Sequence, residues 1–279
     1  MVAVLDACTI LNILQVTLDE RYIVMIEKVF DEIVIPNKVY EEIQKNKSQN
    51  LVDSSSEKQL SSIIHSHILK HVDFAEPVKE VRFVTKALGQ LEKNGEFYSI
   101  CHCLSRSRSG TNHLREFLLK TSFITDDLPA ETAFSEFYKI NIMGQIMNSI
   151  DLLTLFCLKG FIGPNEVLKF CNSLKLLYNK NATLLLHQLK EVNEKYEEIL
   201  DLKERSIITE IITQLNDLSD YAIERINTLV AMKEFKSISK KCSNLPSLVA
   251  ALQKSNFREK IPEINKRMKY LEHVYELNY

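Results

Sequence analysis

The chain has 279 residues, of which 45% are hydrophobic and 26% are charged, and its formal net charge is −2. This composition excludes wholesale disorder, and the small net charge excludes a generally basic nucleic-acid wrapper, although not a local basic patch. No apolar run reaches the roughly 20 residues that span a bilayer, and the six cysteines form no C-x-x-C pair. We therefore expect a cytoplasmic protein with reduced thiols and no membrane partner.

Short apolar runs alternate with helical patterns in the first half of the chain. The predicted strands cover residues 1–5, 33–35, 68–74, 122–125 and 140–143. The predicted helices cover residues 9–15, 37–44 (with Asn37 as a candidate N-cap), 76–88, 96–104 and 144–158, and a polar, serine-rich loop at 45–62 leads into a further helix. This alternation predicts an α/β domain with a parallel sheet and helices on both of its faces.

The second half of the chain contains no glycine. All six glycines lie before residue 164, and the sequence Gly-Phe-Ile-Gly-Pro at 160–164 breaks a helical pattern. Glycine supplies the positive φ of tight turns, so its absence favours long helices joined by short polar loops. We therefore predict an α/β domain over residues 1–163 and an all-α helical domain over residues 164–279.

Apolar residues in the helical half recur with a period near 3.5. They are Ile208, Ile211, Ile212, Leu215, Leu218, Ala222, Ile226 and Leu229. This pattern predicts a packing seam, either within a helical bundle or between chains of a homo-oligomer. Four lysines between Lys233 and Lys241 form either a solvated face or a surface that guides nucleic acid.

Acidic residues recur where the predicted strands end. Asp6 closes the first strand, Glu42 lies on the helix after the second, and Glu96 opens a later helix. Asp126 and Asp127 follow the strand at 122–125. Because the carboxyl ends of parallel strands meet at one edge of a sheet, these carboxylates should converge there and repel one another unless cations neutralise them. Mg²⁺ and Mn²⁺ prefer oxygen ligands, and such a site can activate water against a phosphodiester.

The order of these segments resembles the PIN-domain nuclease family, in particular its toxin-type ribonucleases, over about residues 1–160. The matching segments are Val4 to Leu11, Ile35 to Ile43, Asn94 to Ile100, Phe123 to Asp127 and Ile142 to Met147. The resemblance implies a PIN-like three-layer α/β/α sandwich with a central parallel sheet. It also implies a hydrolase that is a metal-dependent phosphodiesterase.

The resemblance also implies roles for individual residues. The residues expected to take part in catalysis are Asp6, Glu42, Glu96, Asp126 and Asp127. Among them, Asp6, Glu96 and the aspartate pair are the expected ligands of Mg²⁺ or Mn²⁺, and the sequence leaves open which of the two aspartates binds. Thr9 and Thr125 stand where small hydroxyl residues often support the metal shell.

Our leading hypothesis is a Mg²⁺- or Mn²⁺-dependent endoribonuclease, either a toxin or a defence effector, with RNA as substrate and an inhibitor or antitoxin as partner. Arg106, Arg108 and Arg115 form either a phosphate-binding edge or a basic loop. The alternative hypothesis is a catalytically inactive PIN-like scaffold that assembles through its helical domain. His65, His67 and His71 have the spacing of a zinc cluster, but they lack paired cysteines or acids, which favours solvated histidines.

Overall fold

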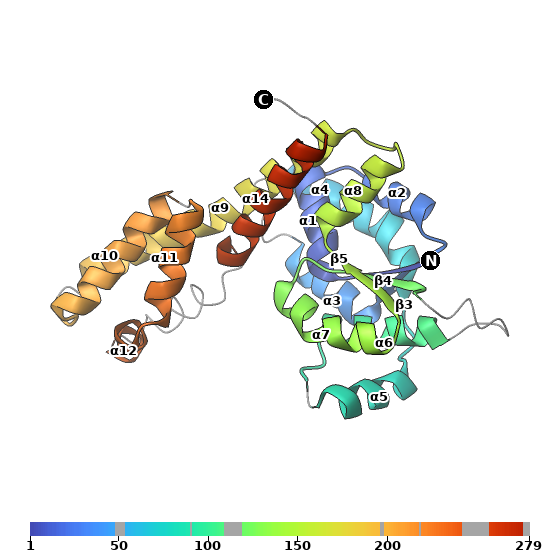
Figure 1. Ribbon diagram of the computed structural model, residues 1–279, viewed down its shortest axis with the longest axis horizontal. Coiled ribbons are helices and arrows are strands. Elements are labelled where there is room, and N and C mark those ends of the chain that lie inside the picture. Colours follow the sequence, from blue (N-terminus) through green and yellow to red (C-terminus); the bar gives the residue numbers. More distant parts are fainter. Residues whose placement is uncertain are drawn as a thin grey trace. The chain divides into compact units, whose positions relative to one another are not determined.

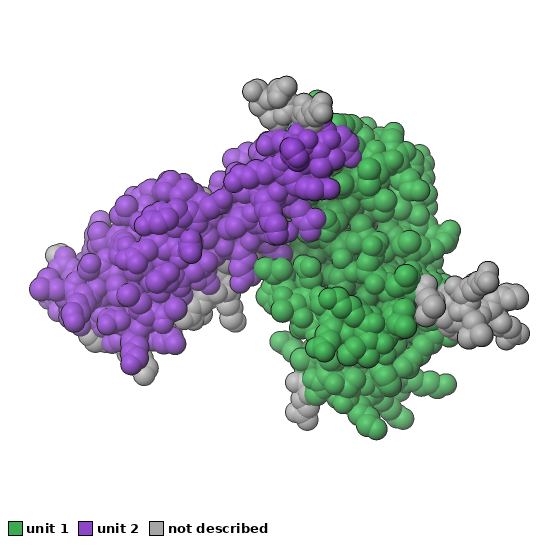
Figure 2. All heavy atoms as spheres, in the orientation of Figure 1, with its two compact units in different colours: residues 1–170 green, residues 171–279 purple. Residues whose placement is uncertain are grey.

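The computed structural model describes residues 1–47, 54–89, 91–108, 119–195, 198–217, 219–241 and 257–275. The chain forms two compact units, residues 1–170 and 171–279 (Figures 1 and 2). The predicted boundary between residues 163 and 164 stays a prediction. The helix α9 (Pro164–Lys195) begins at that point, and its residues belong partly to each unit.

The first unit is built on a parallel sheet of five strands in the order β3-β2-β1-β4-β5. The strands are β1 (Val2–Leu5), β2 (Glu32–Pro36), β3 (Val72–Asp73), β4 (Thr121–Ile124) and β5 (Gly144–Met147). All residues of the central strands β1 and β4 are buried, as expected where helices cover both faces of a parallel sheet. The predicted α/β class with a parallel sheet is therefore confirmed.

Eight α-helices accompany the sheet among the described residues before α9. They are α1 (Ala7–Thr17), α2 (Arg21–Val29), α3 (Asn37–Asn46), α4 (Ser54–Ile63), α5 (Val78–Leu88), α6 (Gly95–Arg108), α7 (Leu128–Ile140) and α8 (Ser149–Leu158). In Figure 1, α6 and α7 lie on one side of the sheet, and α1 and α8 lie on the other. Phe97, Ile100 and Leu104 of α6 belong to the same apolar cluster as Val4 and Phe123 of the central strands. This packing fixes α6 across the middle of the sheet.

Several predicted features differ from the structure. The helix expected at 144–158 begins only at Ser149, because residues 144–147 form β5, and part of the loop expected at 45–62 is the helix α4. The expected strand at 68–74 is mostly helical, because a π-helical turn (Ile64–Ile68) and a 3₁₀ turn (Leu69–His71) come before the two-residue strand β3. The expected strand at 140–143 is displaced to β5, because α7 continues to Ile140 and the strand starts at Gly144. Asn37 is the first residue of α3 rather than its N-cap, and its side chain donates to Glu41.

The described elements of the second unit are helices: the rest of α9, α10 (Leu202–Asp217), α11 (Asp220–Ala231), α12 (Lys233–Lys241) and α14 (Phe257–Val274). The predicted seam is not one continuous helix. The Ser219 hydroxyl accepts a hydrogen bond from Ala222 N (3.2 Å) and caps a new helix, α11, which packs against α10. Leu218 lies outside the described residues. Ile208, Ile211 and Leu215 of α10 are buried, as are Ala222, Ile226 and Leu229 of α11. The seam is therefore packed within one chain.

No helix among the described residues is both long and apolar enough to cross a membrane.

We expect Gly144→Ala to lower the free energy of unfolding by about 2 kcal/mol or more. Gly144 has a φ of +145°, and a Cβ there would lie 1.8 Å from the carbonyl oxygen of Thr121 on β4. Chemical denaturation measures the loss. Gly160→Ala is the matched control, because Gly160 also has a positive φ (+73°) but has no atom within 4 Å of the added Cβ. Equal losses in the two variants would show that the contact with Thr121 is not what requires glycine.

Candidate functional site

The site forms where β1 and β4 end side by side. The two strands pair in parallel up to Leu5 opposite Ile124, and the Asp6 N–H extends the ladder by donating to the Ile124 carbonyl oxygen (3.0 Å). The next residue on each strand, Asp6 and Thr125, therefore emerges at the same edge of the sheet.

Asp6 is buried and held by two donors. Its Oδ2 accepts hydrogen bonds from the Thr125 hydroxyl (3.0 Å) and the Cys8 thiol (2.7 Å), and its side chain is only 2% exposed. Burial raises the pKa of Asp6 to about 6, and the charge of Glu42 acts in the same direction, while the hydrogen bonds lower it. The hydrogen bonds to Asp6 therefore do not fully compensate for the cost of burying its negative charge.

Glu96 and Asp127 meet at the start of α6. Asn94 caps this helix by accepting from Phe97 N (3.1 Å), and its amide also donates to Glu96 Oε2 (3.2 Å). Burial raises the pKa of Glu96 to about 9, and a hydrogen-bonded contact with the Asp127 carboxyl is the next cause. Glu96 is therefore protonated at neutral pH, and its carboxyl group can donate a hydrogen bond to Asp127.

Glu42 approaches the same place from α3. Its Oε1 accepts a hydrogen bond from Gly95 N (2.8 Å). A Cβ on Gly95 would lie only 2.6 Å from Glu42 Oε2, so the Glu42 carboxylate can keep this position only beside a glycine. Glu42 is thus fixed beside the first turn of α6, near enough to Asp6 for its charge to raise the pKa of that aspartate.

The two consecutive aspartates after β4 have different surroundings. Asp126 is buried, and it accepts hydrogen bonds from the Asn12 amide (2.6 Å) and from Ser149 N (2.7 Å). Both of its oxygens are therefore occupied in tying α1 and the start of α8 to the end of β4. Asp127 is half-buried and faces Glu96. Asp127 is thus the aspartate for which the structure shows a contact with another acid of the cluster.

The two predicted supporting threonines also differ. The Thr125 hydroxyl donates to Asp6 and accepts from Asp127 N (3.0 Å), so it joins the ends of both central strands. Thr9 is completely buried on α1, and its hydroxyl has no hydrogen-bond partner among the described residues. Thr125 belongs to the carboxylate cluster, whereas the structure gives Thr9 no contact with it.

Arg106 and Arg108 do not join this cluster. Arg106 forms ion pairs with Glu32 (2.7 Å) and Asp73 (3.0 Å), and the Arg108 guanidinium lies over the Phe83 ring (4.2 Å). Arg106 is ten residues beyond Glu96 on the same helix, which corresponds to about 15 Å along its axis. Arg115 lies outside the described residues.

The three histidines, for which the sequence favours solvated side chains over a zinc cluster, have different surroundings. His67 pairs with Glu20 (3.2 Å), His71 pairs with Glu27 (3.0 Å), and His65 is exposed. Within the described ranges, no three His, Cys, Asp or Glu side chains are arranged, as they stand, to hold a metal ion. A cation at the carboxylate cluster therefore requires its half-buried members, Glu96 and Asp127, to change their mutual contact.

Sequence reasoning missed three polar residues of the site: Cys8, Asn12 and Asn94. Cys8 and Asn12 follow Asp6 on α1. Cys8 binds Asp6 after β1 and Asn12 binds Asp126 after β4, and no sequence pattern indicates either contact. Asn94 stands directly before the Gly-Glu that opens α6, and this is a recognisable N-cap position.

Comparison with known proteins finds no family model, no curated protein and no solved structure that matches the chain. The interpretation of the site therefore rests on its own chemistry.

We expect Glu96→Gln to raise the free energy of unfolding of the metal-free protein at pH 8 by about 1–2 kcal/mol. The effect is modest because the Glu96 carboxyl group is partly solvated. The pKa of Glu96 rises from an ordinary value near 4.5 to about 9 on folding, so the folded state binds the extra proton. The contribution of this carboxyl to stability is complete below pH 4.5 and is lost as the pH rises towards 9.

Urea denaturation of both proteins from pH 4 to pH 9 in EDTA tests this prediction. The advantage of the variant should grow with pH. A constant difference would contradict the raised pKa of Glu96.

We expect Gly95→Ala to weaken Mg²⁺ binding by about tenfold, the loss that disturbing a supporting contact of a metal site typically causes. The added methyl group would displace the Glu42 carboxylate while leaving a good helix former in the first turn of α6. Thermal stabilisation by Mg²⁺ measures the effect. Gly163→Ala, where nothing lies within 4 Å of the new Cβ, should behave as wild type.

Proposed function

We propose that the chain is a Mg²⁺- or Mn²⁺-dependent endoribonuclease with a PIN-like domain over residues 1–163. The observation that supports this proposal is the convergence of Asp6, Glu42, Glu96 and Asp127 from four different elements at one edge of a parallel sheet. The carboxyl ends of the strands are where open α/β sheets bind their ligands.

The donor set fits a hard divalent cation, because it consists of carboxylate oxygens and includes the contact between Glu96 and Asp127. Asp6, Glu96 and Asp127 would hold the ion, which supplies positive charge and an activated water for attack on a phosphodiester. Asp126 is removed from the proposed ligands, since both its oxygens already accept hydrogen bonds from the protein.

The other residues of the cluster position these carboxylates. Thr125 orients Asp6 through its hydroxyl and fixes the Asp127 backbone at the same time. Asn94 holds one oxygen of Glu96, and Gly95 N holds Glu42. These contacts limit the freedom of the acids before any cation or substrate arrives, which reduces the cost of assembling the site.

The proposal extends to the partners implied by the toxin-type resemblance, namely RNA as substrate and a protein inhibitor. It also assigns an all-α domain at residues 164–279 to association between chains. Because the seam of α10 and α11 is buried within one chain, association would use another surface of these helices.

We expect Asp127→Asn to lower RNA cleavage by about 100-fold or more while the fold is kept, because the loss of one charge weakens cation binding and leaves the core intact. Asp6→Asn should have the same effect. Asp126→Asn is the contrasting variant. An amide in place of that buried carboxylate cannot accept from both Asn12 and Ser149, so its main effect should be a loss of about 1–3 kcal/mol of stability.

Cleavage of structured RNA and of DNA in Mg²⁺, Mn²⁺ or EDTA is the measurement. Wild-type rates in Asp127→Asn would contradict the proposed site. Absence of cleavage by the wild-type protein under every condition would favour the inactive scaffold.

A further inference from the structure

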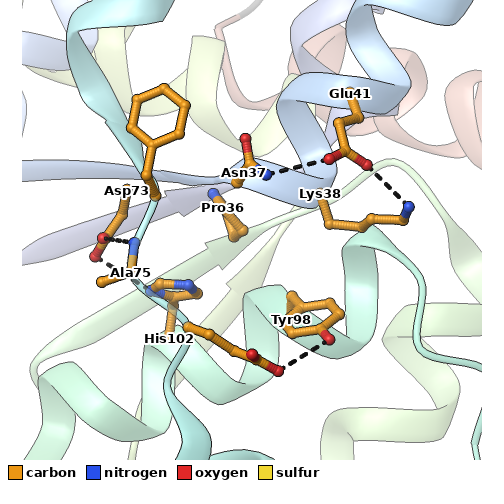
Figure 3. Close-up of a pocket in the computed structure, with 10 residues that line it drawn as sticks. Pro36, Asn37, Lys38, Glu41, Asp73, Ala75, Tyr98 and His102 are labelled. Atoms are coloured by element: carbon orange, nitrogen blue, oxygen red, sulfur yellow. Dashed lines mark hydrogen bonds and ion pairs between the residues drawn. The ribbon is translucent and has the colours of Figure 1, made fainter.

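A pocket of about 300 Å³ lies beside the carboxylate cluster, where β2 and β3 end and α3 approaches α6 (Figure 3). Pro36 and Asp73, which pair at the ends of these two strands, line it together with residues of both helices. None of the carboxylates assigned to the proposed metal site lines this pocket. The pocket is therefore a separate feature on the same edge of the sheet.

The pocket is nevertheless adjacent to the carboxylates. Tyr98 lines it two residues after Glu96 on α6, and Glu41 lines it one residue before Glu42 on α3. The pocket is therefore built by the same two helices that carry Glu42 and Glu96.

Flat apolar surfaces form part of the pocket wall. Phe74 is 66% exposed although its ring is large and apolar, and the half-buried ring of Tyr98 and the ring of Pro36 also line the pocket. Figure 3 shows Pro36, Tyr98 and His102 around the same opening. Unpaired bases stack on aromatic side chains of this kind in proteins that bind single-stranded nucleic acid.

The charges of the wall favour a ligand that donates hydrogen bonds rather than an anion. Three carboxylates, Glu41, Asp73 and Glu76, line the pocket, against one lysine, Lys38. Lys38 is paired with Glu41 (2.9 Å), and Asp73 is paired with Arg106 (3.0 Å). Glu76 is exposed, and the contact that the structure gives it is with the Tyr98 hydroxyl (3.3 Å). A phosphate would meet these acids, whereas an amino group could donate to Glu76.

A buried histidine adds a second polar group. His102 is 3% exposed and lines the pocket, and its Nδ1 forms no hydrogen bond with any described residue. The nearest acidic oxygen, Asp73 Oδ2, lies 3.5 Å away. This Nδ1 is itself buried and faces the Asp73 carboxylate, so His102 closes the wall of the pocket.

We propose that this pocket binds an unpaired nucleobase with an exocyclic amino group, that is adenine, cytosine or guanine, with the base stacked on Phe74 and its amino group donating to Glu76. Carboxylates accept hydrogen bonds from such amino groups, and uracil has none to offer. The choice of RNA as the source of the base rests on the proposed nuclease function, but binding of the base does not.

The chain contains no tryptophan, so Phe74→Trp creates a single fluorescent reporter in the pocket. We expect adenosine, cytidine and guanosine to quench it at concentrations about tenfold lower than uridine, the ratio expected from one hydrogen bond to a charged group. Adding Glu76→Gln to the Phe74→Trp variant should reduce this difference between the nucleosides. The glutamine amide has one acceptor oxygen, and its contact with the Tyr98 hydroxyl uses that oxygen.

Ile140→Trp is the matched control. Ile140 is 71% exposed at the end of α7, and the β5 strand that follows it begins at the opposite edge of the sheet. Equal quenching of Phe74→Trp by all four nucleosides, no quenching at all, or the same pattern in the control would each overturn the proposal.

Cleavage kinetics separate this inference from the nuclease proposal. Phe74→Ala should raise the KM for single-stranded RNA about tenfold with little change in kcat, a loss typical of one stacked base. Ile140→Ala should change neither. Selective quenching without any cleavage would leave the pocket assigned and reject the nuclease, whereas cleavage with an unchanged KM in Phe74→Ala would reject the pocket.

Discussion

The parallel register between β1 and β4 is the constraint on which the carboxylate cluster depends. Because Leu5 lies opposite Ile124, the chain leaves the sheet at Asp6 and Thr125 at the same level, and the Thr125 hydroxyl can bind the aspartate. A slip of one residue would turn Asp6 to the other face of the sheet, since successive side chains alternate. Buried apolar residues along both strands oppose such a slip, so the packing of the core also fixes the position of the acids.

This arrangement concentrates negative charge where little water reaches it. Burial raises the pKa of both Asp6 and Glu96, and the contact with Asp127 adds to the effect at Glu96. A proton is the smallest cation that relieves the repulsion, and a divalent ion would relieve more of it. The hydrogen bonds from Thr125 and Asn94 act against the natural tendency of these carboxylates to separate.

The sequence predicted the parts of this site that depend on where strands end. Asp6, Glu42 and Glu96 were found from their places after strands or at a helix start, and these local patterns survive in the structure. The different roles of Asp126 and Asp127 could not be predicted. Asp126 accepts hydrogen bonds from Asn12 and Ser149, and both of these residues are distant from it in the sequence. The position of β5 was missed because the helical pattern before it gives no sign that α7 runs to Ile140.

The helix α6 relates the carboxylates to the neighbouring pocket. Its first turn holds Glu96, its second turn carries Tyr98 into the pocket wall, and Arg106 near its end pairs with Asp73. Arg106, for which the sequence allowed either a phosphate-binding edge or a basic loop, therefore neutralises an acid of the pocket. Since Arg106 already occupies Asp73, Glu76 is left as the carboxylate best able to accept from a ligand. Selectivity for a base with an amino group would follow because Glu41 and Asp73 are paired with basic residues, whereas Glu76 is exposed to a ligand.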